Sequence, residues 1–391
     1  MIPVAEALER LLALVAPLEA ETVPLRAAHG RVLARDARAL RTQPPFSAAA
    51  MDGYAVADEG LAPGARYRVI GDSAAGARFA GALGPGEAVR IFTGAPVPAA
   101  ATHVVIQEDV TRDGDSITVT DRLGAGRNIR PEGGDFRKGA VLLSAPRRLG
   151  PADLALLAAM GHATVAVHRR PEVALICTGD ELAMPGEPLG PDQIVVSNAF
   201  GLAAMIEAAG GIPRLLPIAR DTEESHAQIL GLAQGADLVV TCGGASVGDR
   251  DLVAKVAMAL GAELGFHKVA IRPGKPLMAG RLFDRPMIGL PGNPVSAMVC
   301  GQVFLQPVLA AMQGLPARPA SRLRTVLATD LPANGPRDHY MRALLSPAGI
   351  SVLPDQDSSL LSVLSRADAL LIRPAGEGAR KAGEPAEYLP L

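Results

Sequence analysis

From Pro171 to about residue 260, short apolar runs alternate with helical patterns. The apolar runs include EVALIC, RLLPIA and ADLVVT, and each is followed by a helical pattern of about 10–15 residues, such as SNAFGLAAMIEAAGG or DTEESHAQILGLAQG. This alternation predicts βαβ units with right-handed crossovers and a parallel sheet. Ligands of such sheets bind at the carboxyl ends of the strands. The loops that follow these strands are therefore the first place to look for a site.

The rest of the chain has a different pattern of expected strands and helices. At 391 residues it exceeds what one hydrophobic core usually organises. After a helical start, short β-prone pieces such as YRVI and SITVT alternate with turn signals, helical character returns at PADLALLAAMG, and short β pieces follow again near the end. We predict a multi-domain α/β plus β protein. Its expected parts are a mixed N-terminal domain (1–40 and 137–170), an inserted β-rich domain (41–136), an α/β domain (171–315) and a C-terminal β domain (316–391).

Composition excludes several classes of function. Hydrophobic residues make up 49% and charged residues 20% of the chain, which is typical of a globular protein. A net charge of -2 and 3% aromatic residues argue against nucleic-acid binding. Glu6 and Glu9 interrupt the apolar start, and no stretch reaches the roughly 20 apolar residues of a membrane span. Three separated cysteines favour buried thiols in a reducing compartment. We expect a cytoplasmic protein with no membrane and no nucleic-acid partner.

The loop GGASVGDRD follows the apolar strand ADLVVT and precedes a helical pattern. Its glycines let backbone amides approach a ligand, and amides at a helix N-terminus favour an anion. The candidate anion-binding residues are Gly243, Gly244, Ser246 and Gly248. Asp249 and Asp251 would repel a bare phosphate, so they fit best as ligands of a bridging Mg²⁺. Either aspartate could instead cap the helix that follows.

Two further loops carry positive charge or turn chemistry. Of the 38 basic residues only five are lysines, and Lys268 and Lys275 flank the short segment that contains Arg272. Lys275 would present a compact positive charge to an oxyanion, or would lie in a solvated turn. The loop GLPGNP joins the strand MIGL to the helix VSAMVC, and strand-to-helix packing alone could also explain it. Its candidate binding residues are Pro291, Gly292, Asn293 and Pro294.

A fourth loop, TGDE, follows the first strand of the α/β domain. Thr178, Gly179, Asp180 and Glu181 could contact a ligand there or form a capped turn. In the β-rich domain the motifs MDGYA, TGAP and NIR, the last followed by Asp135, each place a polar residue among turn formers, and each is a weak signal by itself.

Taken together and in order, MDGYA, TGAP, NIR with Asp135, TGDEL, GGASVGDRD, RPGKP and GLPGNPVSA resemble the molybdopterin molybdenumtransferase family, the bacterial relatives of the gephyrin E domain. The resemblance spans nearly the whole chain. It implies an elongated subunit in four parts, with a molybdopterin-binding α/β domain and a C-terminal β-barrel. It also implies a homodimer whose active-site cleft lies between the α/β domain of one subunit and the β-rich domain of the other, with docking to the adenylyltransferase and other maturation proteins.

The activity implied is the reaction of adenylylated molybdopterin with molybdate, dependent on Mg²⁺, to give molybdenum cofactor and AMP. Catalytic positions carried over from the family are Asp52, Thr93, Asp135, Glu181, Asp221, Asp251, Lys268 and Lys275. Asp221 joins Asp249 and Asp251 as a metal position, and Arg342 and Ser358, in HYMR and QDSS, join Arg272, Lys275 and Ser246 at the molybdate position. The family often has lysine where Arg272 stands, and a planar guanidinium replaces a point charge there.

Two other functions remain open at this stage. The first is a non-catalytic carrier or scaffold for molybdenum cofactor, and the second is a molybdopterin adenylyltransferase. A carrier would not need the acidic set Asp221, Asp249 and Asp251. The adenylyltransferase shares the α/β domain, and the inserted and terminal β segments weigh against it.

Overall fold

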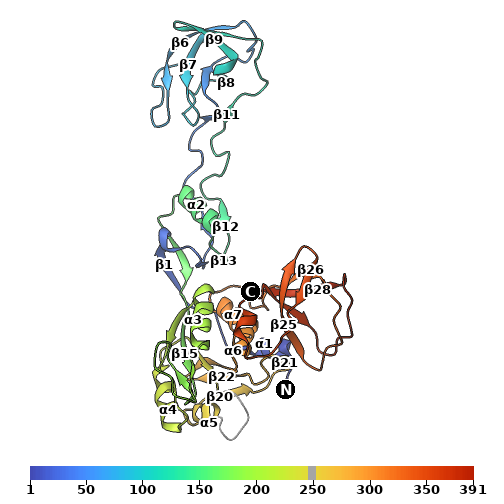
Figure 1. Cartoon of the computed structure of the whole chain (residues 1–391). Coiled ribbons are helices and arrows are strands. Elements are labelled where there is room, and N and C mark those ends of the chain that lie inside the picture. Colours follow the sequence, from blue (N-terminus) through green and yellow to red (C-terminus); the bar gives the residue numbers. More distant parts are fainter. Residues whose placement is uncertain (245–251) are drawn as a thin grey trace.

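A computed structural model of the chain describes residues 1–244 and 252–391. Figure 1 shows an elongated molecule, with the inserted β-rich part at one end and the α/β part at the other. A narrow middle part that contains α2, β12 and β13 joins them, and the C-terminal β part lies beside the α/β part. This arrangement holds the inserted part far from the α/β sheet of the same chain.

The middle part is built around a four-stranded sheet in the order β1-β14-β2-β13. Two of its strands precede the inserted part and two follow it: β1 (Ala20–Pro24), β2 (Val32–Leu33), β13 (Arg147–Arg148) and β14 (Thr164–His168). Helix α2 (Pro151–Met160) begins at a proline, and Gly161 with φ 94° ends it, as its sequence predicts. Leu157 and Met160 of α2 are fully buried in the core of this part.

The inserted part is a six-stranded sheet in the order β8-β5-β7-β6-β10-β9. Its strands are β5 (Gly53–Val56), β6 (Arg66–Ser73), β7 (Glu87–Ile91), β8 (His103–Ile106), β9 (Val110–Asp113) and β10 (Ser116–Val119). Tyr54 and Val56 lie in one hydrophobic cluster, and Ala55 lies in another. Since side chains alternate along a strand, both faces of this sheet are covered by apolar side chains.

The α/β part contains a second six-stranded sheet, in the order β18-β15-β19-β23-β22-β20. Its strands are β15 (Glu172–Cys177), β18 (Ile212–Leu215), β19 (Leu238–Cys242), β20 (Glu263–Phe266), β22 (Met278–Leu282) and β23 (Arg285–Leu290). The pairs β15–β18, β15–β19 and β19–β23 are parallel, as predicted, and β22 and β20 extend the sheet antiparallel. The domain is therefore mixed rather than wholly parallel. Its antiparallel extension begins at a two-residue hairpin in which Phe283 and Asp284 both have positive φ.

Helices cover this sheet, and their buried apolar side chains share its core. They are α3 (Asn198–Ala208), α4 (Glu223–Leu232), α5 (Leu252–Ala259), α6 (Pro294–Cys300) and α7 (Gln306–Met312), with a π-helical turn η3 (Gly301–Leu305) between the last two. Among the described residues, the stretch Pro294–Met312 is long and apolar enough to span a membrane. It is nevertheless a core element, because 78% of its apolar window is buried inside the protein.

The N-terminal helix α1 (Val4–Leu12) packs into the α/β core rather than against the middle part. Its residues Val4, Ala7, Leu8 and Leu11 are buried in the same cluster as the sheet residues of the α/β part. The sequence places this helix in the mixed N-terminal domain, and its apolar stripe alone does not say which core covers it.

The C-terminal part is a curved sheet in the order β21-β25-β27-β28-β24, with β26 paired to β25. The strands are β21 (Ile271–Arg272), β24 (Leu323–Val326), β25 (Asp338–Ser346), β26 (Gly349–Val352), β27 (Ala369–Arg373) and β28 (Pro385–Pro390), and α8 (Leu361–Leu364) precedes β27. A bridge between Leu327 and Ile350 connects the β24 end to β26 and closes the barrel. The loop RPGKP therefore begins in the terminal sheet, because β21 pairs with β25.

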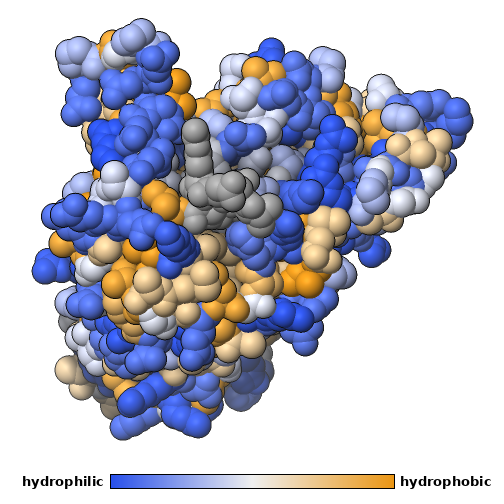
Figure 2. All heavy atoms as spheres, turned by 90° about the horizontal axis from the view of Figure 1, so that it is seen from below, coloured by the Kyte–Doolittle hydropathy of each residue, from blue (hydrophilic) through white to orange (hydrophobic). Residues whose placement is uncertain are grey.

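The remaining elements are short and connect the larger ones. They are η1 (Leu25–Ala27), β3 (Ala37–Arg38), β4 (Ala48–Ala49), η2 (Gln107–Asp109), β11 (Ile129–Arg130), β12 (Val141–Leu143), β16 (Leu182–Ala183) and β17 (Ile194–Val195). The surface seen from the α/β end is mostly hydrophilic, with hydrophobic residues in small groups (Figure 2).

A bidentate ion pair between Arg169 and Asp237 connects the middle part to the α/β sheet. Arg169, just after β14, donates to both carboxylate oxygens of buried Asp237 at 2.7 and 2.8 Å, and the Glu172 backbone N–H donates to the same carboxylate at 2.8 Å. The carboxylate of Glu19 contacts the same guanidinium from the solvent side.

We expect D237N to lower the unfolding free energy by about 2 kcal/mol in chemical denaturation, because a buried charged hydrogen-bond partner is lost. E19Q is the matched control, and it should leave stability unchanged.

The ion pair of Arg169 and Asp237 predicts that the stability of the protein depends on pH. Hydrogen bonds from Arg169 and Glu172 outweigh burial and hold the pKa of Asp237 below its ordinary value of 3.8. The stabilisation is therefore complete above about pH 5, and it declines as the pH falls through 3.8 towards the lowered value. The stability difference between wild type and D237N should shrink over that range. A difference that stays constant down to pH 2.5, roughly a unit or more below the ordinary pKa, would contradict this role.

Candidate active site at the edge of the α/β sheet

A cavity of about 710 Å³ lies where β15, β19 and β23 end. Ten of the predicted site residues line it: Thr178, Gly179, Glu181, Asp221, Gly243, Gly244, Pro291, Gly292, Asn293 and Pro294. Pro276, at the end of the RPGKP loop, also reaches this cavity. The carboxyl edge of the parallel strands thus brings together the first, third and fourth predicted loops.

Close approach of backbones at this edge explains its glycines. Gly243 has φ 99°, and a Cβ there would lie 2.8 Å from Thr178 Oγ1 and 2.9 Å from the Thr178 carbonyl oxygen. A Cβ on Gly292 would lie 3.4 Å from the Gly243 Cα. A larger residue at position 243 would therefore collide with Thr178, and the loop needs glycine there, whereas a Cβ at position 292 would only touch Gly243.

Polar residues missed in the sequence complete the cavity. Asn198, at the first turn of α3, donates from Nδ2 to the Gly292 carbonyl oxygen at 2.7 Å and to Cys242 Sγ at 3.1 Å. Ser197, His226 and Ser359 line the cavity as well. The signal that could have found Asn198 is the Ser-Asn pair at the start of a helical pattern, a common position for helix-capping residues.

Carboxylates occupy one side of the cavity. Glu181 and Asp221 both line it, and Asp180 Oδ1 accepts a hydrogen bond from the Asp221 backbone N–H at 3.1 Å. Arg220 Nη1 donates to the carbonyl oxygens of residues 179, 180 and 182 and so ties this loop to the next one. The acidic side is therefore held by backbone contacts, which leave the carboxylates of Glu181 and Asp221 facing the cavity.

A buried basic centre lies at the junction with the terminal barrel. Arg342 is 0% exposed, and its Nε and Nη1 atoms have no hydrogen-bond partner among the described residues. Its Nη2 donates to the Asp357 carbonyl oxygen at 2.9 Å, and burial lowers the pKa of the guanidinium. Buried donors are almost always paired, so this guanidinium lacks partners that a buried arginine usually has.

Other basic residues surround this centre. Arg272 lies on β21, in register with His339 on β25. Burial, followed by the charges of Arg272, Arg342, Arg337 and Arg373, lowers the pKa of His339 to about 4. The imidazole is therefore neutral at neutral pH, and the positive charge of this region comes from arginine.

Ser358 connects the basic centre to the cavity. Its Oγ accepts a hydrogen bond from Asn293 Nδ2 at 2.9 Å, and its carbonyl oxygen accepts from the Val295 backbone N–H at 3.0 Å. The carbonyl oxygen of Asp357, the residue before Ser358, accepts a hydrogen bond from Arg342 Nη2. Lys275 is exposed and Lys268 is half-buried, on the segment that leads into and out of β21.

The predicted residues of the inserted part form a separate group. Asp52 Oδ1 accepts hydrogen bonds from both the hydroxyl and the backbone N–H of Thr93, each at 2.7 Å, and these bonds lower the pKa of Asp52. Asp135 is exposed in the same part. Figure 1 places this part at the opposite end of the molecule from the α/β sheet. One chain therefore does not bring Asp52, Thr93 and Asp135 to the cavity.

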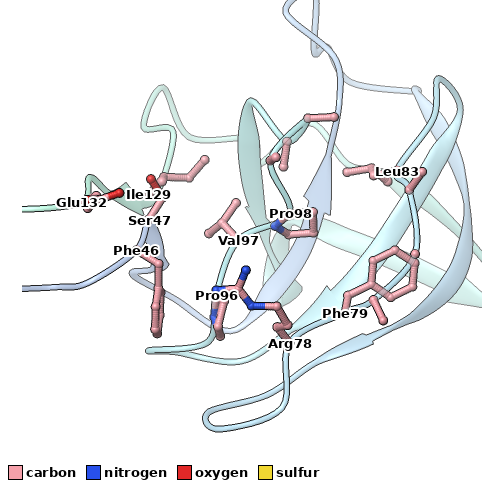
Figure 3. Close-up of a pocket in the computed structure, with 16 residues that line it drawn as sticks. Phe46, Ser47, Arg78, Phe79, Leu83, Pro96, Val97, Pro98, Ile129 and Glu132 are labelled. Carbon is pink, nitrogen blue, oxygen red and sulfur yellow. The ribbon is translucent and has the colours of Figure 1, made fainter.

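A second cavity, of about 660 Å³, lies in the inserted part itself. In Figure 3 Arg78 extends towards Phe46, and its guanidinium carbon is 5.8 Å from the centre of that ring. Pro96, Val97 and Pro98 form the opposite wall. None of the predicted site residues lines this cavity, so the cavity at the sheet edge is the better candidate. Ser246, Gly248, Asp249 and Asp251 lie outside the described residues.

Comparison with known proteins matches nearly the whole chain, in three segments. Residues 2–161 match the MoeA N-terminal region (domain I and II), residues 174–311 match the probable molybdopterin binding domain, and residues 324–391 match the MoeA C-terminal region (domain IV). The fold and the cavity therefore define a protein of the multi-domain class whose α/β domain is of the molybdopterin-binding type.

Relatives over the full length make the assignment specific. A molybdopterin molybdenumtransferase of Bacillus subtilis is 34% identical over 407 aligned positions, which cover 99% of this chain and 94% of the relative. Molybdopterin molybdenumtransferase 2 of Mycobacterium tuberculosis is 39% identical and 83% of each chain is covered. The crystal structure of the molybdopterin biosynthesis moeA protein from Pyrococcus horikoshii OT3 has a TM-score of 0.86 at 30% identity and full coverage of both chains. The chain belongs to the molybdopterin molybdenumtransferase family, and the predicted family and fold class are confirmed.

The unpaired guanidinium of Arg342 predicts a separation of stability from binding. Replacing it in R342M removes a buried charge with few partners, so the unfolding free energy should stay the same or rise by about 1 kcal/mol. Arg373 is a matched control. It is also buried, and its Nε and Nη2 are bonded to Glu377 and to the carbonyl oxygens of Pro332 and Gly378. R373M should therefore lose about 3 kcal/mol. Equal losses in the two variants, measured by denaturant unfolding, would show that Arg342 is a structural residue.

Proposed function

We propose that this chain inserts molybdate into adenylylated molybdopterin and releases AMP, giving molybdenum cofactor. Two observations carry the proposal: a cavity of about 710 Å³ lined by Glu181 and Asp221, and the buried, incompletely bonded Arg342, which is bonded to the 357–359 segment that reaches this cavity at Ser359. A pterin nucleotide needs a cavity of this size with a few polar groups, and molybdate needs cationic donors next to it. The names of the full-length relatives agree with this reading.

The basic centre supports binding of a doubly charged oxyanion. The free Nε and Nη1 of Arg342 each carry N–H donors, and each can form a charge-assisted hydrogen bond to an oxyanion. Arg272, Lys275 and Ser358 are the other proposed contacts. Because the site is preorganised and partly dry, its charges neutralise the anion without reorganising solvent, and its walls place the anion beside the pterin.

The acidic side of the cavity is suited to Mg²⁺. Mg²⁺ is usually held by one or two carboxylates together with phosphate oxygens and waters. Among the described residues no group of three or more His, Cys, Asp or Glu side chains gathers. Glu181 and Asp221 at the cavity provide hard oxygen donors of that limited kind. Asp221, with Asp249 and Asp251 of the undescribed loop, is the proposed ligand set. When bound, Mg²⁺ would neutralise the phosphoanhydride.

A homodimer would complete the site. Asp52 and Thr93 form a bonded pair in the inserted part, far from the cavity of their own chain (Figure 1). We propose that they, with Asp135, close the cavity of a partner subunit. Docking of the adenylyltransferase and other maturation proteins to this dimer, and a cytoplasmic location, are part of the same proposal. Three free, buried cysteines suit a reducing compartment.

The activity is tested by mixing the purified protein with adenylylated molybdopterin, molybdate and Mg²⁺ and measuring AMP release and activation of an apo-molybdoenzyme. We expect AMP release that depends on molybdate. K275A should raise the molybdate concentration for half-maximal rate about tenfold, since one cationic contact is lost. K381A is the matched control, because Lys381 pairs with Asp330 on the barrel surface. Absence of AMP release by the wild type would leave the carrier function standing.

The shared cleft predicts that two inactive variants complement each other. D52A and D221A homodimers should each lose turnover. When subunits are exchanged at random, half of the dimers are mixed and each carries one intact site, so about a quarter of the wild-type activity should return. A D52A,D221A double variant mixed with wild type is the control for subunit exchange. No recovery despite proven exchange would place all of these residues in one subunit's site, and full turnover of the D52A homodimer would remove Asp52 from it.

A further inference from the structure

Two cysteines face each other at the floor of the cavity. Cys177 is the last residue of β15 and Cys242 the last residue of β19, and the two are directly paired in the parallel register. Both line the cavity, with exposed fractions of 4% and 2%. The proposed insertion reaction assigns neither thiol a task.

The environments of the two thiols differ in a way that gives them different reactivities. The neighbouring Cys242 thiol and the Ala199 backbone N–H, in the first turn of α3, lower the pKa of Cys177 despite burial. The Cys242 thiol lies against Cys177 and 3.4 Å from the Pro291 carbonyl oxygen, and its pKa is raised. Cys177 is therefore the better nucleophile of the pair.

We propose that Cys177 and Cys242 form a modification site for hydroperoxides, in which a two-electron oxidation converts the dithiol into a disulfide and closes the cavity. The Cys177 sulfur attacks one peroxide oxygen, the O–O bond breaks, and the leaving oxygen departs as water or alcohol. The sulfenic acid at Cys177 is then attacked by the Cys242 sulfur. The S–O bond breaks and water leaves with the Cys242 proton. Two thiols and one hydroperoxide thus give one disulfide, with the peroxide as the electron acceptor.

The backbone geometry allows this bond. Neighbouring strands lie about 4.8 Å apart, and a disulfide accepts Cα separations of about 4.4–6.8 Å. The two cysteines are direct neighbours on such strands, and the side chains of paired residues point to the same face of the sheet. A small movement of the side chains therefore brings the two sulfur atoms together.

Closure of the disulfide would alter the cavity because the strand ends are tightly packed. Thr178 follows Cys177 and Gly243 follows Cys242, and there is no room for even a methyl group between them. Asn198 would also lose the Cys242 thiol as its hydrogen-bond acceptor while it still holds the Gly292 carbonyl. The predicted loss of pterin binding rests on the proposed function, whereas formation of the disulfide does not.

The first test measures the thiols without any assay of activity. The full-length reduced protein is treated with a few equivalents of hydrogen peroxide and mapped by mass spectrometry. We expect a cross-linked pair of peptides that contain Cys177 and Cys242, with a mass loss of about 2 Da, while Cys300 stays reduced. Cys300 is an internal control because it is buried and burial raises the pKa of its thiol. Peroxide treatment that leaves Cys177 and Cys242 reduced, or oxidises all three equally, overturns the proposal.

Variants then test the order of events and the effect on the cavity. In C242A the sulfenic acid has no partner, so Cys177 should gain about 32 Da as sulfinic acid, and a thiol reductant should not reverse it. C177A should react about tenfold more slowly than wild type, since only the less acidic thiol remains. C300A should behave as wild type. Wild-type AMP release should fall at least about tenfold on oxidation and return with reductant.

The outcomes separate this inference from the proposed function. A disulfide that forms in a protein without AMP-releasing activity contradicts the proposed function and leaves the modification site intact. Unchanged AMP release from fully cross-linked protein overturns the claim that the disulfide closes the cavity.

Discussion

The fully buried guanidinium of Arg342 is the constraint on which the site depends. Taking an ion out of water costs several kcal/mol unless partners replace the water, and here two nitrogens are left without a partner among the described residues. The position is possible because strand β25 is clamped between β21 and β27, which belong to segments on both sides of the domain junction. A rigid junction can hold an unsatisfied charge in place for an anion that arrives later.

The acidic and basic halves of the site are kept apart by the fold. Glu181 and Asp221 come from loops at the carboxyl edge of the parallel strands, whereas Arg272 and Arg342 come from the barrel sheet that shares β21. Asn293 and Ser358, joined at 2.9 Å, link the two halves. An arrangement of this kind lets cations hold an oxyanion while carboxylates serve a metal ion, without direct neutralisation of one by the other. The cavity between them is where a pterin nucleotide would connect the two.

Much of this site can be predicted from the sequence, because its loops follow apolar strands. Apolar runs followed by glycine-rich loops predict strand ends, and ten predicted residues meet in one cavity because the carboxyl ends of β15, β19 and β23 share an edge. The antiparallel hairpin at Phe283 and Asp284 was missed because neither residue is the glycine or asparagine typical of such turns. The RPGKP loop was expected at the α/β sheet, and its β21 instead pairs with β25 through long-range contacts that no local pattern encodes. The domain boundaries stay a prediction.

Pairing across strands also explains why Cys177 and Cys242 lie together, which no sequence motif predicts. Cys177 and Cys242 are 65 residues apart in the numbering, and only the register of β15 with β19 makes them neighbours. Likewise, burial of Arg342 follows from packing of the barrel and cannot be read from HYMR. The short strands predict the inserted β-rich part, whereas its distance from the cavity is implied only by the family resemblance and is seen in the elongated shape (Figure 1).

The most direct test of the account is to locate the oxyanion. Crystals of the protein soaked with molybdate, or with tungstate as a heavier probe, should show an anomalous peak at the metal atom of an oxyanion whose oxygens accept hydrogen bonds from a free nitrogen of Arg342, with Arg272 and Ser358 beside it. Crystals of R342M treated in the same way should lack that peak. An oxyanion bound with equal occupancy in R342M, or found only at a different place in the wild type, would contradict the central claim that the buried guanidinium is the molybdate site.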